Sequence, residues 1–196
     1  MSSSNRSNYF VHSLLRAHDW QHRPQLDQVC DWWKRGGTGV CALVGIGGAG
    51  KTAIAERFLQ VLPGVMPVHE RIAKDFSLPT PHSTFVFSFY DAPNPEAFFE
   101  ALQMWLEQTP RVSVVASFHQ LLFLIQRAPG LLIVDGLEKV QEDGGRGMLG
   151  KLASPKLRDF LEHVAAGHAP HLSVLITTRF PLADLRDQLV APQVRH

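Results

Sequence analysis

The sequence predicts an α/β fold of three layers, in which helices cover both faces of a parallel sheet. Along the 196 residues, short runs of apolar and β-branched residues alternate with longer segments whose apolar residues recur at helical spacing. One run, residues 131–134, is fully apolar, as expected for a strand buried on both sides of a parallel sheet. Such alternation is typical of βαβ units, whose crossover helices lie on the sheet faces.

The composition fits one folded domain with a polar lead-in. Apolar residues make up 45% of the chain and charged residues 19%. The formal net charge of +1 gives no electrostatic reason to expect a nucleic-acid or membrane partner, and no apolar run is long enough to span a bilayer. Cys30 and Cys41 lack disulfide or metal-ligand spacing, which suits a cytoplasmic location. We therefore interpret residues 1–19 as a polar and helical lead-in and residues 20–196 as the domain.

The first elements of the chain are a short helix, a longer helix, a strand and a second long helix. Pro24 suits the first position of a helix, while Gly36-Gly37 and Pro63-Gly64 are typical of helix ends. The expected ranges are 9–15, 24–34, 40–44 and 51–62.

The remainder of the domain begins with a long connection, residues 63–82, that is rich in proline and charge. Asn94-Pro95 and Ser154-Pro155 then predict two helix starts, and Pro129-Gly130 predicts a helix end. We expect strands at 84–90, 131–134 and 172–176, and helices from 94, at 113–127, from 154 and at 182–189, with a glycine-rich loop at 143–150.

A glycine loop between the strand at 40–44 and the helix at 51–62 fits G-x-x-x-x-G-K-[ST] at every fixed position. Its glycines allow backbone N–H groups to surround a phosphate at a helix N-terminus. Lys51 would contact the β- and γ-phosphates, and the Thr52 hydroxyl would ligate Mg²⁺. The strand–loop–helix context disfavours a glycine-rich turn with an incidental lysine. The predicted ATP or ADP site comprises Gly45, Ile46, Gly47, Gly48, Ala49, Gly50, Lys51, Thr52 and Ala53.

Two acids follow the apolar strand at 131–134. Asp135 would emerge at the carboxyl end of the strand, where ligands bind in open α/β sheets, and it could hold the Mg²⁺ shell. Glu138 could orient and deprotonate an attacking water. In that role, Glu138→Gln removes hydrolysis and leaves nucleotide binding intact. The alternatives are that Asp135 is a turn residue before Gly136 and that Glu138 is an exposed acid.

A second buried strand, at 172–176, delivers Thr177, Thr178 and Arg179 to the same edge of the sheet. A guanidinium there could fork onto a γ-phosphate and so report its presence. The alternative partner for Arg179 is a nearby acid such as Asp184.

In this order, the glycine loop GIGGAGKT, the Asp-Gly-Leu-Glu segment and the Thr-Thr-Arg element resemble the STAND class of P-loop NTPases, which includes NB-ARC and NACHT. The loop and Thr-Thr-Arg look most like NB-ARC and its bacterial relatives. Asp-Gly-Leu-Glu looks more like NACHT, where an acid three residues after the Mg²⁺ aspartate is the usual base candidate. Lys139 departs from NACHT, which often has a further acid, and Gly136 departs from NB-ARC, which often has a second Asp.

The resemblance covers about residues 20–179 and implies an adenine contact at Trp20 and Arg23, although His22 stands where the class usually has Gly. It also implies catalytic roles for the residues singled out above, namely Lys51, Asp135, Glu138 and Arg179. STAND proteins continue into a helical lid, a winged-helix domain and a repeat sensor, which do not follow here. We therefore expect a domain of a longer protein, cut short where residues 193–196 begin a fifth strand.

The implied function is a regulatory ATPase switch of a signalling or defence protein, in which slow hydrolysis is coupled to self-association of the full-length chain. A scaffold that binds ATP without useful turnover is one alternative. A small-molecule kinase is another, although the sequence contains no recognisable acceptor site or Arg-rich lid.

Overall fold

The computed structural model describes residues 8–14, 20–72, 77–108, 117–144 and 148–185. Within them, a five-stranded sheet has the order β1-β3-β4-β5-β2, and every pairing in it is parallel. The strands are β1 (Tyr9–Phe10), β2 (Gly39–Val44), β3 (Thr84–Ser88), β4 (Gly130–Asp135) and β5 (Leu172–Thr178).

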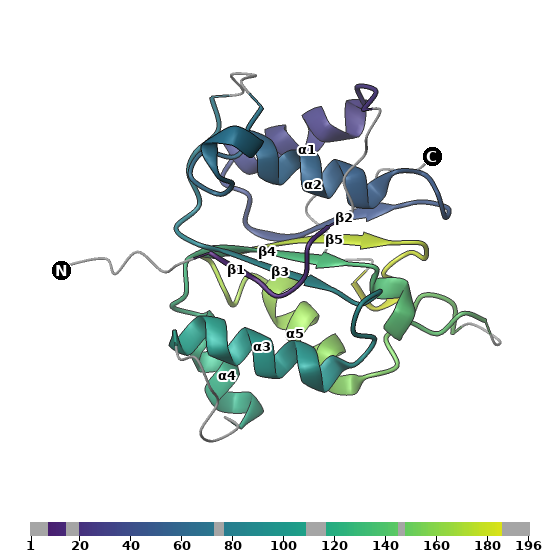
Figure 1. Cartoon of the computed structure of the whole chain (residues 1–196). Coiled ribbons are helices and arrows are strands. Elements are labelled where there is room, and N and C mark those ends of the chain that lie inside the picture. Colours follow the sequence, from purple (N-terminus) through teal and green to yellow (C-terminus); the bar gives the residue numbers. More distant parts are fainter. Residues whose placement is uncertain (1–7, 15–19, 73–76, 109–116, 145–147, 186–196) are drawn as a thin grey trace.

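Helices cover both faces of this sheet, so the predicted three-layer α/β architecture is confirmed (Figure 1). One face carries α1 (Pro24–Lys34) and α2 (Lys51–Val61), and the other carries α3 (Pro95–Glu107), α4 (Phe118–Ile125) and α5 (Pro155–Ala165). Each face has its own apolar core. Aromatic rings such as Phe87, Phe98 and Phe160 fill the core under α3, α4 and α5, while Phe58 and Leu59 of α2 belong to the core on the α1 and α2 face.

Side-chain caps explain where α3, α4 and α5 begin, and the starts of α3 and α5 are the predicted ones. Asn94 accepts a hydrogen bond from the Glu96 N–H at 2.9 Å, and Ser154 accepts one from the Leu157 N–H at 3.3 Å. Ser117 forms a capping box at the start of α4, which corresponds to the helix expected at 113–127. Residues 109–116 lie outside the described part of the chain.

The predicted helix at 9–15 is wrong. Tyr9 and Phe10 form β1, which pairs with β3 through Tyr9↔Phe85 and Phe10↔Val86, and none of residues 8–14 is helical. A short apolar run fits either element, and here the edge of β3 determines the result. The N-terminal segment thus contributes a strand to the sheet.

Three connections among the described residues contain 3-10 turns. The first is η1 (Val68–Glu70), in the long connection after α2, and the second is η2 (Leu137–Val140), which follows β4 after Gly136. The third is η3 (Ala183–Leu185), where a helix at 182–189 was expected. Residues 186–196, including the proposed start of a fifth strand, lie outside the described residues, as do residues 1–7 and 15–19.

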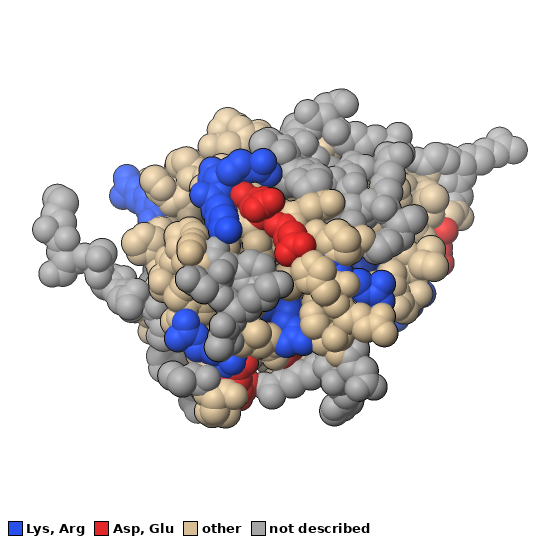
Figure 2. Space-filling view, turned by 90° about the horizontal axis from the view of Figure 1, so that it is seen from above, with Lys and Arg blue, Asp and Glu red and all other residues tan. Residues whose placement is uncertain are grey.

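Basic and acidic side chains lie beside one another on the face that carries α1 and α2 (Figure 2). Among the described residues, no helix is long and apolar enough to cross a membrane.

Candidate functional site

The strand registers bring the three predicted motifs to one edge of the sheet. Val44 pairs with Thr178, so the glycine loop starts beside the end of β5, where the Gly45 N–H donates to the Thr178 carbonyl at 3.2 Å. Ser88 of β3 pairs with Asp135 at the end of β4. The carboxyl ends of the strands therefore place the loop, the acids and the Thr-Thr-Arg element together.

The glycine loop has the backbone geometry that its motif predicts. Gly48 and Gly50 have φ values of +78° and +80°, which side-chain-bearing residues rarely adopt. Lys51, the first residue of α2, folds back over the loop and donates from Nζ to the carbonyls of Gly45 and Ile46 at 2.7 and 2.9 Å. An incoming phosphate would compete with these carbonyls for the ammonium group.

The pKa of Lys51 lies below its ordinary value. Burial is the largest cause, and the positive charge of Arg179 acts in the same direction, whereas Glu138 and Asp135 oppose it. These four charged groups thus form one electrostatic unit at the end of the sheet.

Asp135 is buried and accepts hydrogen bonds from three hydroxyl groups. Thr52 and Thr177 donate to Oδ1 at 2.7 and 2.6 Å, and Ser88 lies 3.3 Å from Oδ2. Burial raises the pKa of the Asp135 carboxyl group, and the three hydroxyl donors partly offset this. These hydrogen bonds hold the Asp135 side chain in place at the end of β4, which argues against a simple turn residue.

The pair Thr52 and Asp135 fits a magnesium ion by the chemistry of its donors. Mg²⁺ prefers hard oxygen ligands and usually keeps several of its waters. Because both carboxylate oxygens of Asp135 already accept hydrogen bonds, this residue is suited to holding a metal-bound water, with Thr52 as the direct ligand.

Glu138 is not the exposed acid of the alternative interpretation, since its side chain is only 5% exposed. Oε1 accepts from the Tyr90 hydroxyl and pairs with Arg179 Nε at 3.0 Å. Oε2 accepts from the Arg179 backbone N–H at 3.2 Å. Asp184, the other partner considered for Arg179, instead accepts from the Leu152 N–H at 2.8 Å.

Arg179 also lies against the glycine loop. A Cβ built on Gly47 would meet Arg179 Cζ at 3.2 Å, so the guanidinium packs on the loop backbone. The Arg179 side chain is 50% exposed, which leaves part of it accessible beside the position where phosphates would bind. The geometry therefore places Arg179 between the loop and Glu138.

Tyr90 is a site residue that sequence reasoning missed. Its ring packs on Gly136, where an added Cβ would lie 2.6 Å from ring carbons at a φ of +71°. Burial, followed by the hydrogen bond to Glu138, raises the pKa of Tyr90 to about 12, so its hydroxyl remains a donor. Tyr90 follows β3 by two residues and so lies at the carboxyl edge of the sheet. The sequence pattern places it inside a strand at 84–90, which in the structure ends at Ser88.

The predicted adenine-contacting residues lie beside α1 and α2. Trp20 packs against the guanidinium of Arg57 on α2, with Arg57 Cζ 4.7 Å from the ring centroid. Arg23 is exposed at the start of α1, and His22 pairs with Asp27 at 2.8 Å. Trp20 therefore lies beside the helix that follows the glycine loop.

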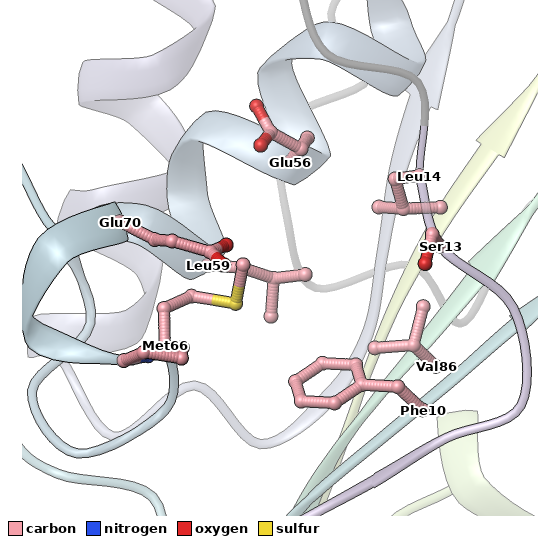
Figure 3. A pocket seen from close by; sticks show the side chains of 9 residues that line it. Phe10, Ser13, Leu14, Glu56, Leu59, Met66, Glu70 and Val86 are labelled. Carbon is pink, nitrogen blue, oxygen red and sulfur yellow. The ribbon is translucent and has the colours of Figure 1, made fainter.

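A separate cavity of about 250 Å³ opens between α2 and the β1 edge (Figure 3). Phe10, Leu59 and Met66 give it an apolar lining, and Glu56 and Glu70 add two carboxyl groups. None of the glycine-loop residues lines it, so it is distinct from the phosphate site.

A parallel sheet with a glycine loop of this sequence between a strand and the helix that follows it is typical of the P-loop NTPase fold. The chain is similar to one in a structure titled "Structure of Drosophila ORC bound to DNA", with 18% identity and a TM-score of 0.52 over 88% of this chain and 40% of that one. It is also similar to a Signal Transduction ATPase with Numerous Domains (STAND) protein with a tetratricopeptide repeat sensor from Pyrococcus horikoshii. That match has 17% identity and a TM-score of 0.48, over 93% of this chain and 24% of the other.

No family model and no curated protein matches the chain. The likeness to solved structures supports the P-loop NTPase fold and does not separate NB-ARC from NACHT. This chain spans less than half of the length of either neighbour.

Proposed function

We propose that this chain is the nucleotide-binding domain of an ATP-dependent switch protein and that it binds ATP or ADP with Mg²⁺. The observation that carries this proposal is the meeting of Lys51, Thr52 and Asp135 at one sheet edge, with Thr52 Oγ1 2.7 Å from Asp135 Oδ1. The backbone N–H groups of the glycine loop and the Lys51 ammonium group, beside the oxygen ligands Thr52 and Asp135, are suited to a polyphosphate with its metal.

Each residue has a distinct role in this proposal. Lys51 leaves the loop carbonyls for the β- and γ-phosphates, and Thr52 and Asp135 hold the metal and its water. Bound Mg²⁺ would neutralise charge on the phosphate oxygens. Glu138 accepts the proton of the attacking water as the bond between the γ-phosphorus and ADP breaks, and Arg179 contacts the γ-phosphate. Trp20 and Arg23 flank the adenine.

The resemblance of the motifs to the STAND class supports a regulatory role in a longer cytoplasmic protein. In that role, ADP keeps the protein closed, ATP permits self-association of the full-length chain, and slow hydrolysis resets it. The loop, the Asp-Gly-Leu-Glu segment and the Thr-Thr-Arg element carry this part of the proposal.

A second candidate function, a scaffold that binds ATP without useful turnover, is favoured by one observation. All three donors that reach Glu138 come from Tyr90 and Arg179, so both carboxylate oxygens are already engaged. Release of phosphate from ATP by the purified protein, absent in Glu138→Gln, would separate the switch from the scaffold. Phosphate transferred to an acceptor instead of water would indicate a kinase.

Calorimetric titration with Mg²⁺ and either nucleotide tests the proposal. Lys51→Ala should weaken binding about tenfold to a hundredfold, because a charge-assisted phosphate contact contributes about 1.5–3 kcal/mol. Lys34→Ala removes an exposed lysine from α1 and serves as the matched control, with an unchanged affinity. Equal affinities for wild type and Lys51→Ala would refute a phosphate site at this loop.

A further inference from the structure

Arg179 contacts both Glu138 and the glycine loop, where a phosphate would be its second anionic partner. Its Nε lies 3.0 Å from Glu138 Oε1 and its backbone N–H lies 3.2 Å from Oε2. Its Cζ lies 3.2 Å from a Cβ built on Gly47 of the loop. A guanidinium in this position can turn toward a phosphate at the loop without any backbone movement.

The Glu138 side chain is buried and held in place, whereas the Arg179 side chain is half exposed and has room to move. The Glu138 side chain is 5% exposed and Tyr90 holds its Oε1, whereas the Arg179 side chain is 50% exposed. The Tyr90 ring is in turn fixed between Gly136 and the Lys139 ammonium, which lies 5.3 Å from the ring centroid. Any exchange of partners therefore moves Arg179 and leaves Glu138 in place.

We propose that Glu138 and the γ-phosphate compete for Arg179, so that Glu138 sets the preference of the site for ATP over ADP. This inference rests on the proposed nucleotide-binding function. Without a γ-phosphate, the guanidinium stays on Glu138 and occupies Oε1 together with Tyr90. With ATP, the guanidinium moves to the γ-phosphate and frees a carboxylate lone pair on Glu138 for a water. The base is thus uncovered only when its substrate is bound.

The competition predicts a thermodynamic effect that a pure base role does not. Part of the attraction between Arg179 and the γ-phosphate is offset by the loss of the Glu138 pair. Glu138→Gln keeps an oxygen for the Tyr90 hydroxyl and removes the charge that retains Arg179. This variant should therefore bind ATP more tightly relative to ADP, which revises the expectation that it leaves binding intact.

The experiment measures the ATP and ADP affinities by calorimetry, with Mg²⁺, for wild type, Glu138→Gln, Arg179→Ala and the double variant. The ratio of ATP to ADP affinity should rise about threefold to tenfold in Glu138→Gln, the range expected for a partly exposed ion pair. In the Arg179→Ala background, Glu138→Gln should leave this ratio unchanged. Glu142→Gln, an equal loss of charge at an exposed position nearby, should also leave it unchanged.

Each outcome distinguishes a cause. An unchanged ratio in Glu138→Gln, in a protein that binds both nucleotides, overturns the competition and leaves the proposed function standing. An equal rise in the Arg179→Ala background also overturns it, because direct repulsion between Glu138 and the γ-phosphate would then be the cause. Absence of nucleotide binding by wild type would instead remove the proposed function itself.

Discussion

At the scale of single residues, Asp135 shows how burial and hydrogen bonding oppose one another at one carboxyl group. Burial raises its pKa above the ordinary value of 3.8, despite donors from Thr177, Thr52 and Ser88. The native protein therefore retains this proton to a higher pH than the unfolded chain does. The stability that this group contributes is fully present below about pH 3.8 and is lost as the pH rises through the raised pKa.

Asp135→Asn should consequently stabilise the protein at pH 7 in the absence of Mg²⁺ and nucleotide. The amide keeps an oxygen for Thr52 and Thr177, and its NH₂ can donate to Ser88. Urea unfolding should show a higher midpoint for the variant at pH 7 and a difference that disappears as the pH approaches 4. With Mg²⁺ and ATP present, the wild type should gain more stability than the variant. A variant that is less stable at pH 7 without ligand would contradict the role of burial.

Glycine is required at position 136 because the Tyr90 ring occupies the space that a Cβ would need. Gly167 has a comparable φ of +82° but no atom within 4 Å of an added Cβ, so it isolates the backbone contribution. We expect Gly167→Ala to cost about 1 kcal/mol and Gly136→Ala about 2–3 kcal/mol, because only the latter displaces the Tyr90 ring. Urea denaturation of both variants checks this. Adding Tyr90→Ala to Gly136→Ala should recover part of the difference, and equal costs at the two glycines would show that the ring yields freely.

At the scale of elements, Asn8 is one of the side chains that anchor β1. Asn8 donates from Nδ2 to the carbonyls of Gly64 and Val65, both at 3.2 Å, and its Oδ1 accepts from the Thr84 N–H at 2.9 Å. These bonds join the N-terminal segment to the turn after α2 and to the first residue of β3. A two-residue strand has few ladder bonds of its own, so side-chain anchors such as Asn8, and His12 whose Nδ1 accepts from the Ser88 N–H at 3.1 Å, help to keep β1 paired.

Asn8→Ala should therefore destabilise the protein by about 1–2 kcal/mol, since it leaves two partly buried backbone groups, the Val65 carbonyl and the Thr84 N–H, without this partner. Ser13→Ala, at an exposed position of the same segment, should change the free energy of unfolding by less than about 0.5 kcal/mol. Denaturant titration distinguishes the two. Equal effects would mean that the N-terminal strand adds nothing to the stability of the sheet.

The same element shows what the sequence could not predict. Helix starts at Pro24, Asn94 and Ser154 were readable because proline and capping side chains act locally. β1 was not readable, because its strand conformation comes from pairing with β3, about 75 residues away along the chain. The convergence of the glycine loop with Asp135 was predictable, since parallel strands present their carboxyl ends at one edge. The engagement of Glu138 by Tyr90 and Arg179 required side-chain positions that no motif specifies.

At the scale of the whole molecule, the site and the sheet share one strand. β2 runs directly into the glycine loop and pairs with β5 from Gly39↔Ser173 to Val44↔Thr178. Cys41, in the middle of β2, is 0% exposed, and burial raises the pKa of its thiol to about 12. The thiol can therefore react only when β2 separates from its neighbours.

Labelling of Cys41 should for this reason report nucleotide binding at a distance from the phosphates. In a Cys30→Ala background, which leaves Cys41 as the sole thiol, an alkylating reagent should modify the native protein only through opening of the sheet. Opening of β2 dismantles the glycine loop that follows it, so ligand must leave first. The labelling rate should fall by a factor of about 1 + [L]/Kd, or about a hundredfold at a nucleotide concentration of 100 Kd.

Mass spectrometry of the labelled protein over time measures this rate. Lys51→Ala is the control, because it should lose the protection that nucleotide gives. If saturating nucleotide leaves the rate unchanged, β2 opens while the site stays intact, and the strand and the loop are then separate cooperative units.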